Sequence, residues 1–216
     1  MISIDQAEFA KRRQTLLSQL EDNSGVIIES STLAARNSDV DYLFRQDSNF
    51  FYFSGFNEPN ALLLLKKVAG KIEYHMFCQP RDKDMEIWFG YRTGEQGLLA
   101  NYQVDFGYSN ELLDDTMVEL LDGLENLYYS QGKAGLHKKI HRWLSAMRKK
   151  SRAGVITPST IKQLDDYTDE MRLIKSAKEQ QLMALASEIS AAAHVRAMSE
   201  CKPGVMEYQL DAHIQH

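Results

Sequence analysis

The chain has 216 residues, of which 44% are hydrophobic and 25% are charged, a composition typical of a globular protein that buries a core. Its formal net charge of −5 gives no general attraction to nucleic acid or anionic membranes. No apolar run approaches the roughly 20 residues needed to span a bilayer, and the N-terminus has no apolar core of a signal peptide. Cys78 and Cys201 are too few and too far apart for a disulfide framework, so we expect buried free thiols in a cytoplasmic protein.

The first 80 residues predict one helix and three strands. Residues 4–20 carry apolar side chains among charges, as in an amphipathic helix. Residues 26–28 then predict a short buried strand, and residues 61–65 and 71–77, separated by Gly70, predict a β-hairpin. Between them, residues 36–59 hold seven of the chain's aromatic residues, interrupted by polar side chains. That stretch fits neither a plain buried strand nor a plain amphipathic helix.

The rest of the chain alternates between helices and strands. We predict an aromatic turn around residues 86–90, strands at 104–106 and 127–129, and helices at 94–100, 110–121 and 136–147. This alternation is typical of α/β layers.

From residue 169 the pattern predicts one long helical region. Within it, Ser176 and Glu179 have the spacing of a capping box, and residues 203–204, Pro-Gly, end the run. A last helix at residues 206–214 has an apolar stripe with nothing obvious to bury it, so we expect the chain to be cut inside a second domain.

Two short patterns resemble catalytic motifs but lack their companions. His137 and His141 have the spacing of two metal ligands on a helix, as do His213 and His216, yet neither pair encloses the glutamate of an HExxH motif. A structural role is therefore favoured for both pairs. Residues 159–162 match the SxxK pattern of serine acyl-enzymes, without the accompanying KTG element.

Charge is distributed unevenly along the chain. Residues 132–163 contain no acid and nine Lys and Arg, eight of them in a basic block at 133–152, whereas residues 94–131 contain no Lys or Arg. Nucleic-acid binding by this basic block is disfavoured, because it has few aromatics to stack on bases. A solvated helix face, or a patch that meets the acidic segment of a neighbouring subunit, is the preferred interpretation. Trp88, by contrast, is open to either a core or a binding role.

Six motifs, in order along nearly the whole chain, resemble the N-terminal domain of bacterial aminopeptidase P, the Xaa-Pro aminopeptidases. They are RNSD at 36–39, RQDSNF at 45–50, YFSGFNEP at 52–59, EIWFG at 86–90, DEMRLIKS at 169–176 and KPGVMEY at 202–208. The resemblance implies an α/β domain with a mixed β-sheet flanked by helices at residues 1–170. It also implies that residues 171–216 are the truncated start of a "pita-bread" catalytic domain.

The resemblance further implies a metallopeptidase that removes the N-terminal residue from peptides with proline in second position, using two manganese ions. The family's metal ligands would lie after His216, so we expect no catalytic residue, no metal and no hydrolysis from this chain alone. Trp88, Asp39 and Arg152 match positions near the family's substrate cleft. The implied partners are proline-containing peptides and further copies of the chain, as a dimer or tetramer, with no nucleic acid or membrane.

Two alternatives share this architecture. One is a relative of prolidase or creatinase; the other is a non-catalytic module that binds peptides or histones. An Asp, Asp, His, Glu, Glu series on later strands would distinguish the peptidase from the binding module.

Overall fold

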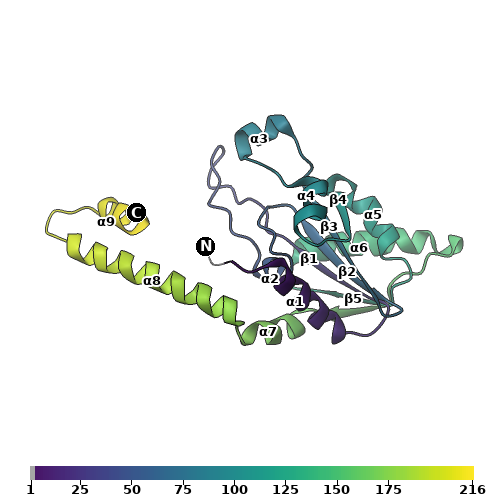
Figure 1. Ribbon diagram of the computed structural model, residues 1–216. Helices are drawn as coiled ribbons and strands as arrows, with labels where there is room; N and C mark the ends of the chain where they lie inside the picture. Colours follow the sequence, from purple (N-terminus) through teal and green to yellow (C-terminus); the bar gives the residue numbers. More distant parts are fainter. Residues whose placement is uncertain (1–2) are drawn as a thin grey trace. The chain divides into compact units, whose positions relative to one another are not determined.

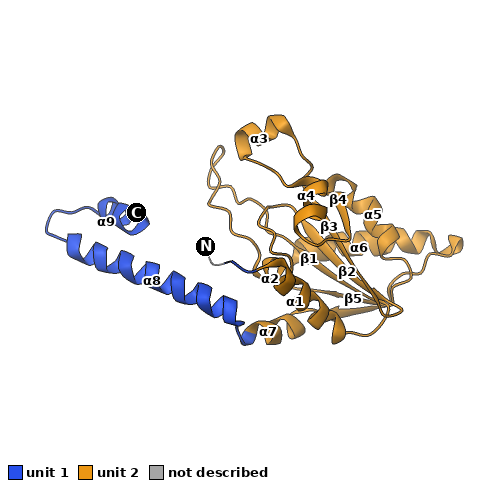
Figure 2. Cartoon of the chain, viewed as in Figure 1, with its two compact units in different colours: residues 1–4, 173–216 blue, residues 5–172 orange. Residues whose placement is uncertain are grey.

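The computed structural model describes residues 3–216, which divide into two units (Figure 2). Residues 5–172 form one compact unit, and residues 3–4 with 173–216 form the other. The assignment of residues 171–216 to a catalytic domain stays a prediction. In the described part of the chain, no helix combines the length and apolar character needed to cross a bilayer.

The larger unit is built on one mixed sheet of six strands in the order β4-β3-β2-β1-β5-β6 (Figure 1). The strands are β1 (Ser24–Glu29), β2 (Leu62–Val68), β3 (Lys71–Cys78), β4 (Phe106–Ser109), β5 (Asn126–Tyr129) and β6 (Thr160–Gln163). β2 pairs antiparallel with β1 and with β3, and the remaining neighbours are parallel. The predicted hairpin is confirmed, with Gly70 at φ +75° in its turn.

Helices cover both faces of this sheet because its central strands are apolar on both sides. In β1, Val26 and Ile28 contribute to one core and Ile27 to the other. The first core is closed by α1 (Gln6–Ser18), α2 (Ser48–Ser54), α4 (Gly94–Asn101) and α7 (Asp165–Leu173), and the second by α5 (Leu113–Leu120) and α6 (Ala134–Lys149). The predicted α/β fold with a mixed, helix-flanked sheet is therefore confirmed.

The structure differs from the predicted elements in three places. Residues 86–89 lie in a helix, α3 (Lys83–Phe89), which ends at Gly90, rather than in a turn, because the Asp82 side chain accepts from the free N–H groups of Asp84 and Met85. Strand β6 was not predicted, since residues 159–162 were considered only as a catalytic motif. The helix expected at 110–121 begins as a short 3₁₀ turn, η1 (Asn110–Leu112). A second such turn, η2 (Ser151–Ala153), follows α6.

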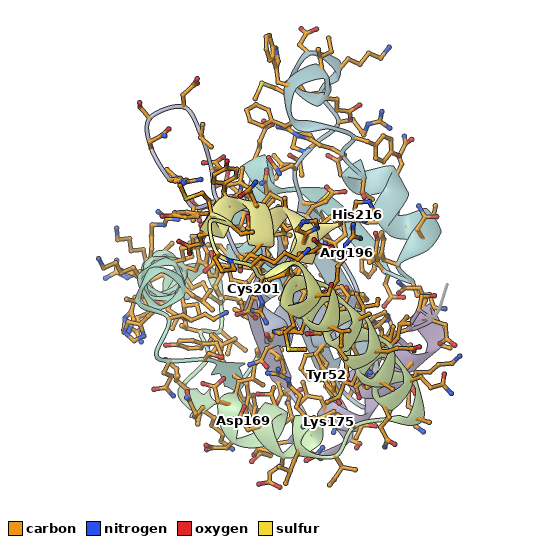
Figure 3. All side chains as sticks on the ribbon, turned by 90° about the vertical axis from the view of Figure 1, so that its left-hand side faces the viewer. Tyr52, Asp169, Lys175, Arg196, Cys201 and His216 are labelled. Atoms are coloured by element: carbon orange, nitrogen blue, oxygen red, sulfur yellow. The ribbon has the colours of Figure 1, made fainter. Side chains whose placement is uncertain are left out.

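The smaller unit contains α8 (Ala177–Glu200) and α9 (Glu207–Gln215). The predicted capping box of Ser176 and Glu179 is confirmed, and it interrupts the single helical region expected from residue 169. Neither helix has a buried residue. Figure 3 shows Arg196 and His216 directed toward one another, 2.9 Å apart between Nη1 and Nδ1. Cys201 is exposed, so its expected burial was wrong.

Candidate ligand-binding surface

The second half of the aromatic stretch anchors the fold. Asp47 caps α2 by accepting from the Phe50 N–H at 2.9 Å, and Phe50, Phe53 and Phe56 are fully buried in the first core. The helix ends with unsatisfied carbonyl groups. The buried Arg13 guanidinium donates to one of them, the Phe53 carbonyl, at 2.8 Å. α1 and α2 are thereby tied together.

Gly55 turns the chain out of α2 toward residues 57–59. Its φ of +66° is in the left-handed region, which glycine adopts without steric cost. The side chain of the buried Gln46 then donates to the carbonyl groups of Phe56, at 3.2 Å, and Glu58, at 2.8 Å. The segment that carries Glu58 is therefore held in a defined position.

The first half of the stretch is an exposed loop. An isolated bridge joins Ala35 to Asp41, and the Asn37 side chain accepts from the N–H groups of Asp39 and Val40 at 3.1 and 3.0 Å. This local bonding holds the tip of the loop and leaves its apolar side chains in solvent; Leu43 is 99% exposed. Asp39 lies on the tip and is itself exposed.

Helix α3 is also apolar on its outside and has no buried residue. Trp88 is 79% exposed, and Ile87 and Phe89 are exposed as well. At the base of the helix, Arg81 forms an ion pair with Glu86 and stacks over the Tyr91 ring, 4.3 Å from its centroid. α3 thus presents an exposed apolar surface on a fixed base.

A pocket of about 460 Å³ lies between this loop, the segment 57–59 and α3. We call it the aromatic pocket. Its apolar walls are Leu33, Phe44, Pro59, Met85, Phe89 and Tyr91. Its charged groups are Asp41, Glu58 and Arg92. No sequence pattern predicts this pocket, because its lining comes from four separate segments. Glu58 belongs to the YFSGFNEP motif at residues 52–59, but the motif alone assigns it no role.

The predicted cleft residues do not all fall together. Asp39 and Trp88 lie on the loop and on α3, two segments that line the aromatic pocket, although neither residue lines it. Arg152 lies in η2, on neither of these segments, and is also exposed. The roles of all three in a substrate cleft stay predictions.

Three cations of the basic block form ion pairs within the chain. Lys133 pairs with Asp47 at 2.7 Å, Lys139 pairs with Glu29, and Arg142 pairs with Asp114. Asp114 belongs to the acidic segment, and it also accepts from the Trp143 indole at 2.7 Å. Part of the acidic segment is therefore met by the chain's own basic helix α6.

The remaining candidate motifs have structural partners. Lys162 of the SxxK match lies in β6 and pairs with the carboxylate of Glu21. An acyl-enzyme would instead need this lysine beside the Ser159 hydroxyl. Burial, followed by the charges of Glu95 and Glu58, raises the pKa of the Cys78 thiol to about 12, which leaves it an unreactive neutral group.

We tested whether the described residues fit the two manganese ions that the family resemblance implies. Within residues 3–216, no three His, Cys, Asp or Glu side chains converge in a way that could hold a metal ion. The ring centroids of His137 and His141 lie 4.5 Å apart with the rings tilted by 55°, and His137 Nδ1 lies 2.8 Å from the Tyr129 hydroxyl. The donor set of this part of the chain does not fit a two-metal centre.

The fold and the motifs define the class of protein. Residues 9–128 match the family model described as "Aminopeptidase P, N-terminal domain". The match covers more than half of the chain, so the chain belongs to this family.

Relatives match over the full chain. The Xaa-Pro aminopeptidase of Escherichia coli is 37% identical over 100% of this chain and 49% of its own length. That of Haemophilus influenzae is 35% identical over 100% of this chain and 48% of its own length. The solved low-pH form of E. coli aminopeptidase P superposes with a TM-score of 0.95 over 99% of this chain and 49% of that one, at 36% identity. The chain therefore spans about half the length of these relatives, and it corresponds to their N-terminal region.

Proposed function

We propose that this chain is the N-terminal, substrate-access part of a manganese-dependent Xaa-Pro aminopeptidase, which releases the N-terminal residue from peptides with proline in second position. The observation that carries the proposal is the match over the whole chain to the E. coli Xaa-Pro aminopeptidase, in sequence and in fold. The names of these relatives favour this activity over that of a prolidase or creatinase.

The chain's own contribution would be contact with the peptide rather than bond cleavage. Trp88 offers an exposed indole on a helix whose base is fixed by the Arg81–Glu86 pair. Asp39 offers an exposed carboxylate on the neighbouring loop. The indole of Trp88 can pack against the apolar proline ring of a peptide. The carboxylate of Asp39 can accept from the peptide's charged amino terminus.

The two manganese ions would be bound by residues of the longer protein that lie outside this chain. When bound, they would supply a metal-activated hydroxide and stabilise the developing oxyanion. The support is the lack of a suitable donor set within residues 3–216, together with the solved E. coli relative that is described as zinc-substituted and in complex with product.

The test is an assay of the longest gene product that contains this chain. A peptide with proline in second position and a matched peptide with alanine there are incubated with the protein, with Mn²⁺ and after chelation. We expect cleavage of the proline peptide alone, loss of cleavage on chelation and recovery with Mn²⁺. A folded, manganese-loaded protein that cleaves neither peptide would overturn the proposal. The 216-residue chain is assayed in parallel, and hydrolysis by it, after contaminating host enzyme is excluded, would contradict its proposed inactivity.

We also propose that the longer protein is a cytoplasmic homo-oligomer, a dimer or a tetramer. The apolar surfaces of α3 and of the loop at residues 33–43 would support self-association, since they are exposed and continuous with a pocket. The free thiols of Cys78 and Cys201 agree with a reducing compartment. Light scattering coupled to gel filtration measures the first property, and cell fractionation measures the second.

A further inference from the structure

The carboxylate of Glu58 is only half satisfied. Its Oε1 atom accepts from the Thr93 N–H at 2.9 Å and from the Thr93 hydroxyl. Its Oε2 atom is buried and has no hydrogen-bond partner. A buried carboxylate oxygen without a donor costs free energy, because it has lost water without a replacement. The structure therefore contains an unmet acceptor at a defined position.

Glu58 is one of the residues that line the aromatic pocket, which is large enough for a small organic ligand. Of the charged groups that line it, Asp41 and Glu58 are acidic and Arg92 is basic, so the lining has a net charge of −1. The Arg92 side chain is already engaged, since its Nη1 atom donates to the Pro80 carbonyl at 3.4 Å. This bond to a neutral carbonyl leaves the Arg92 charge in place, and the two carboxylates of the lining outnumber it.

The walls favour a cation on an apolar body. Phe44, Phe89 and Tyr91 present aromatic rings to the pocket, and the faces of such rings attract cations. Aromatic walls around a carboxylate are a recurrent way to bind an organic ammonium group. One face of Tyr91 is used in the same way inside the chain, by the Arg81 guanidinium.

We propose that the aromatic pocket binds an organic ammonium group carried on an apolar body, with the ammonium pairing with the Glu58 carboxylate and the body lying against Phe44 and Phe89. The ammonium comes either from a small free amine or from a lysine side chain of a peptide. All parts of this site lie within residues 33–92, so its ligand binding can be measured on this chain without any peptidase activity.

The test is a titration of the isotope-labelled 216-residue chain, followed by NMR. The Thr93 amide is the reporter, because its N–H donates to Glu58. The probes are three of nearly equal size: 2-phenylethylamine, the neutral 2-phenylethanol and the anionic 3-phenylpropionate. We expect saturable Thr93 shifts with the amine at about millimolar concentration, binding of the alcohol about tenfold weaker or less, and no binding of the anion. Equal affinities for amine and alcohol, tighter binding of the anion, or no binding of the amine would overturn the proposal.

Matched variants identify the group responsible. Glu58→Gln keeps the size of the side chain and an acceptor for Thr93, and we expect it to weaken amine binding about tenfold or more without changing alcohol binding. Asp84→Asn removes the same charge from an exposed residue of α3 outside the pocket, and we expect no change. Equal effects of the two substitutions would refute the role of Glu58.

A second pair of probes distinguishes the sources. A short blocked peptide with one lysine is compared with the same peptide acetylated on that lysine. Binding of the lysine peptide alone supports the proposal with a peptide as the source, and binding of 2-phenylethylamine without the lysine peptide supports it with a free amine. Equal binding of the lysine and acetyl-lysine peptides contradicts recognition of an ammonium group.

Discussion

Substituting Gly55 by alanine tests how the fold positions the wall of the aromatic pocket. A Cβ atom built at Gly55 would lie 2.4 Å from Phe9 Cε2 and 2.8 Å from two further atoms of that ring. Phe9 is buried and packs edge-on against Phe51 with ring centroids 5.9 Å apart, so it has little room to move. We expect two costs: about 1–2 kcal/mol for a left-handed alanine and about 1–3 kcal/mol for overpacking.

The sum, about 2–5 kcal/mol, is a large part of the roughly 5–15 kcal/mol that stabilises a typical protein. For a chain of this size it corresponds to a fall in Tm on the order of 10 °C. Urea unfolding followed by circular dichroism measures the loss. The control is Gly123→Ala, because Gly123 has a similar φ of +79° but no atom within 4 Å of the added Cβ. It should lose only the conformational cost, about 1–2 kcal/mol.

The contact with Phe9 is isolated by a double-mutant cycle. In a Phe9→Leu background, Gly55→Ala should cost less than in the wild-type chain, by about 1–3 kcal/mol, because the ring that it strikes is gone. If Gly55→Ala costs no more than Gly123→Ala, or if its cost is the same in both backgrounds, the packing argument is refuted.

Three further predictions concern other parts of the chain. Ser176→Ala should destabilise the first turn of α8 by about 1 kcal/mol, which faster amide hydrogen exchange at residues 177–180 would reveal, and unchanged exchange would contradict the capping box. Hydrogen bonds from Lys162, then Tyr128, lower the pKa of Glu21 from 4.5 to about 2. The stability contributed by Glu21 is therefore complete above about pH 4.5 and is lost as the pH falls toward 2. In Glu21→Gln the urea midpoint of unfolding should change less with pH between pH 5 and 2.5 than in the wild-type chain. The same pH dependence in both chains would refute this. Trp88→Ala in the longer protein should lower activity on longer peptides with metal content unchanged, and unaltered kinetics would remove Trp88 from the cleft.

The sequence was informative wherever the physical signal is local. A continuous apolar run and an alternating run, with Gly70 between them, were enough to predict the hairpin of β2 and β3. The spacing of Ser176 and Glu179 was enough to predict where α8 begins. In both cases the residues that decide the structure lie within a few positions of each other.

It was less informative where the deciding partner is distant. Arg13 is a charged residue of an amphipathic helix, and nothing near it in the sequence indicates burial, yet it is buried because the Phe53 carbonyl, 40 residues away, needs a donor. Strand β6 is mostly polar and partly exposed at the edge of the sheet, so its alternation gives little signal; only its pairing with β5 makes it a strand. The aromatic pocket has the same origin, since four segments meet there only after the chain has folded.

The aromatic stretch at residues 36–59 combines two roles that composition alone does not separate. Its later rings, Phe50 and Phe53, are buried and hold α2 against the sheet, whereas Tyr42 and Leu43 project from the loop into solvent. The buried part fixes the ends of the loop through Gln46, which accepts from the Ser31 N–H and donates to the Glu58 carbonyl, both at 2.8 Å. An exposed apolar loop loses less conformational entropy on binding when its ends are already fixed. One continuous stretch thus supplies part of the rigid core and part of the exposed surface. The buried part holds the ends of the exposed loop in place and so preorganises it for binding.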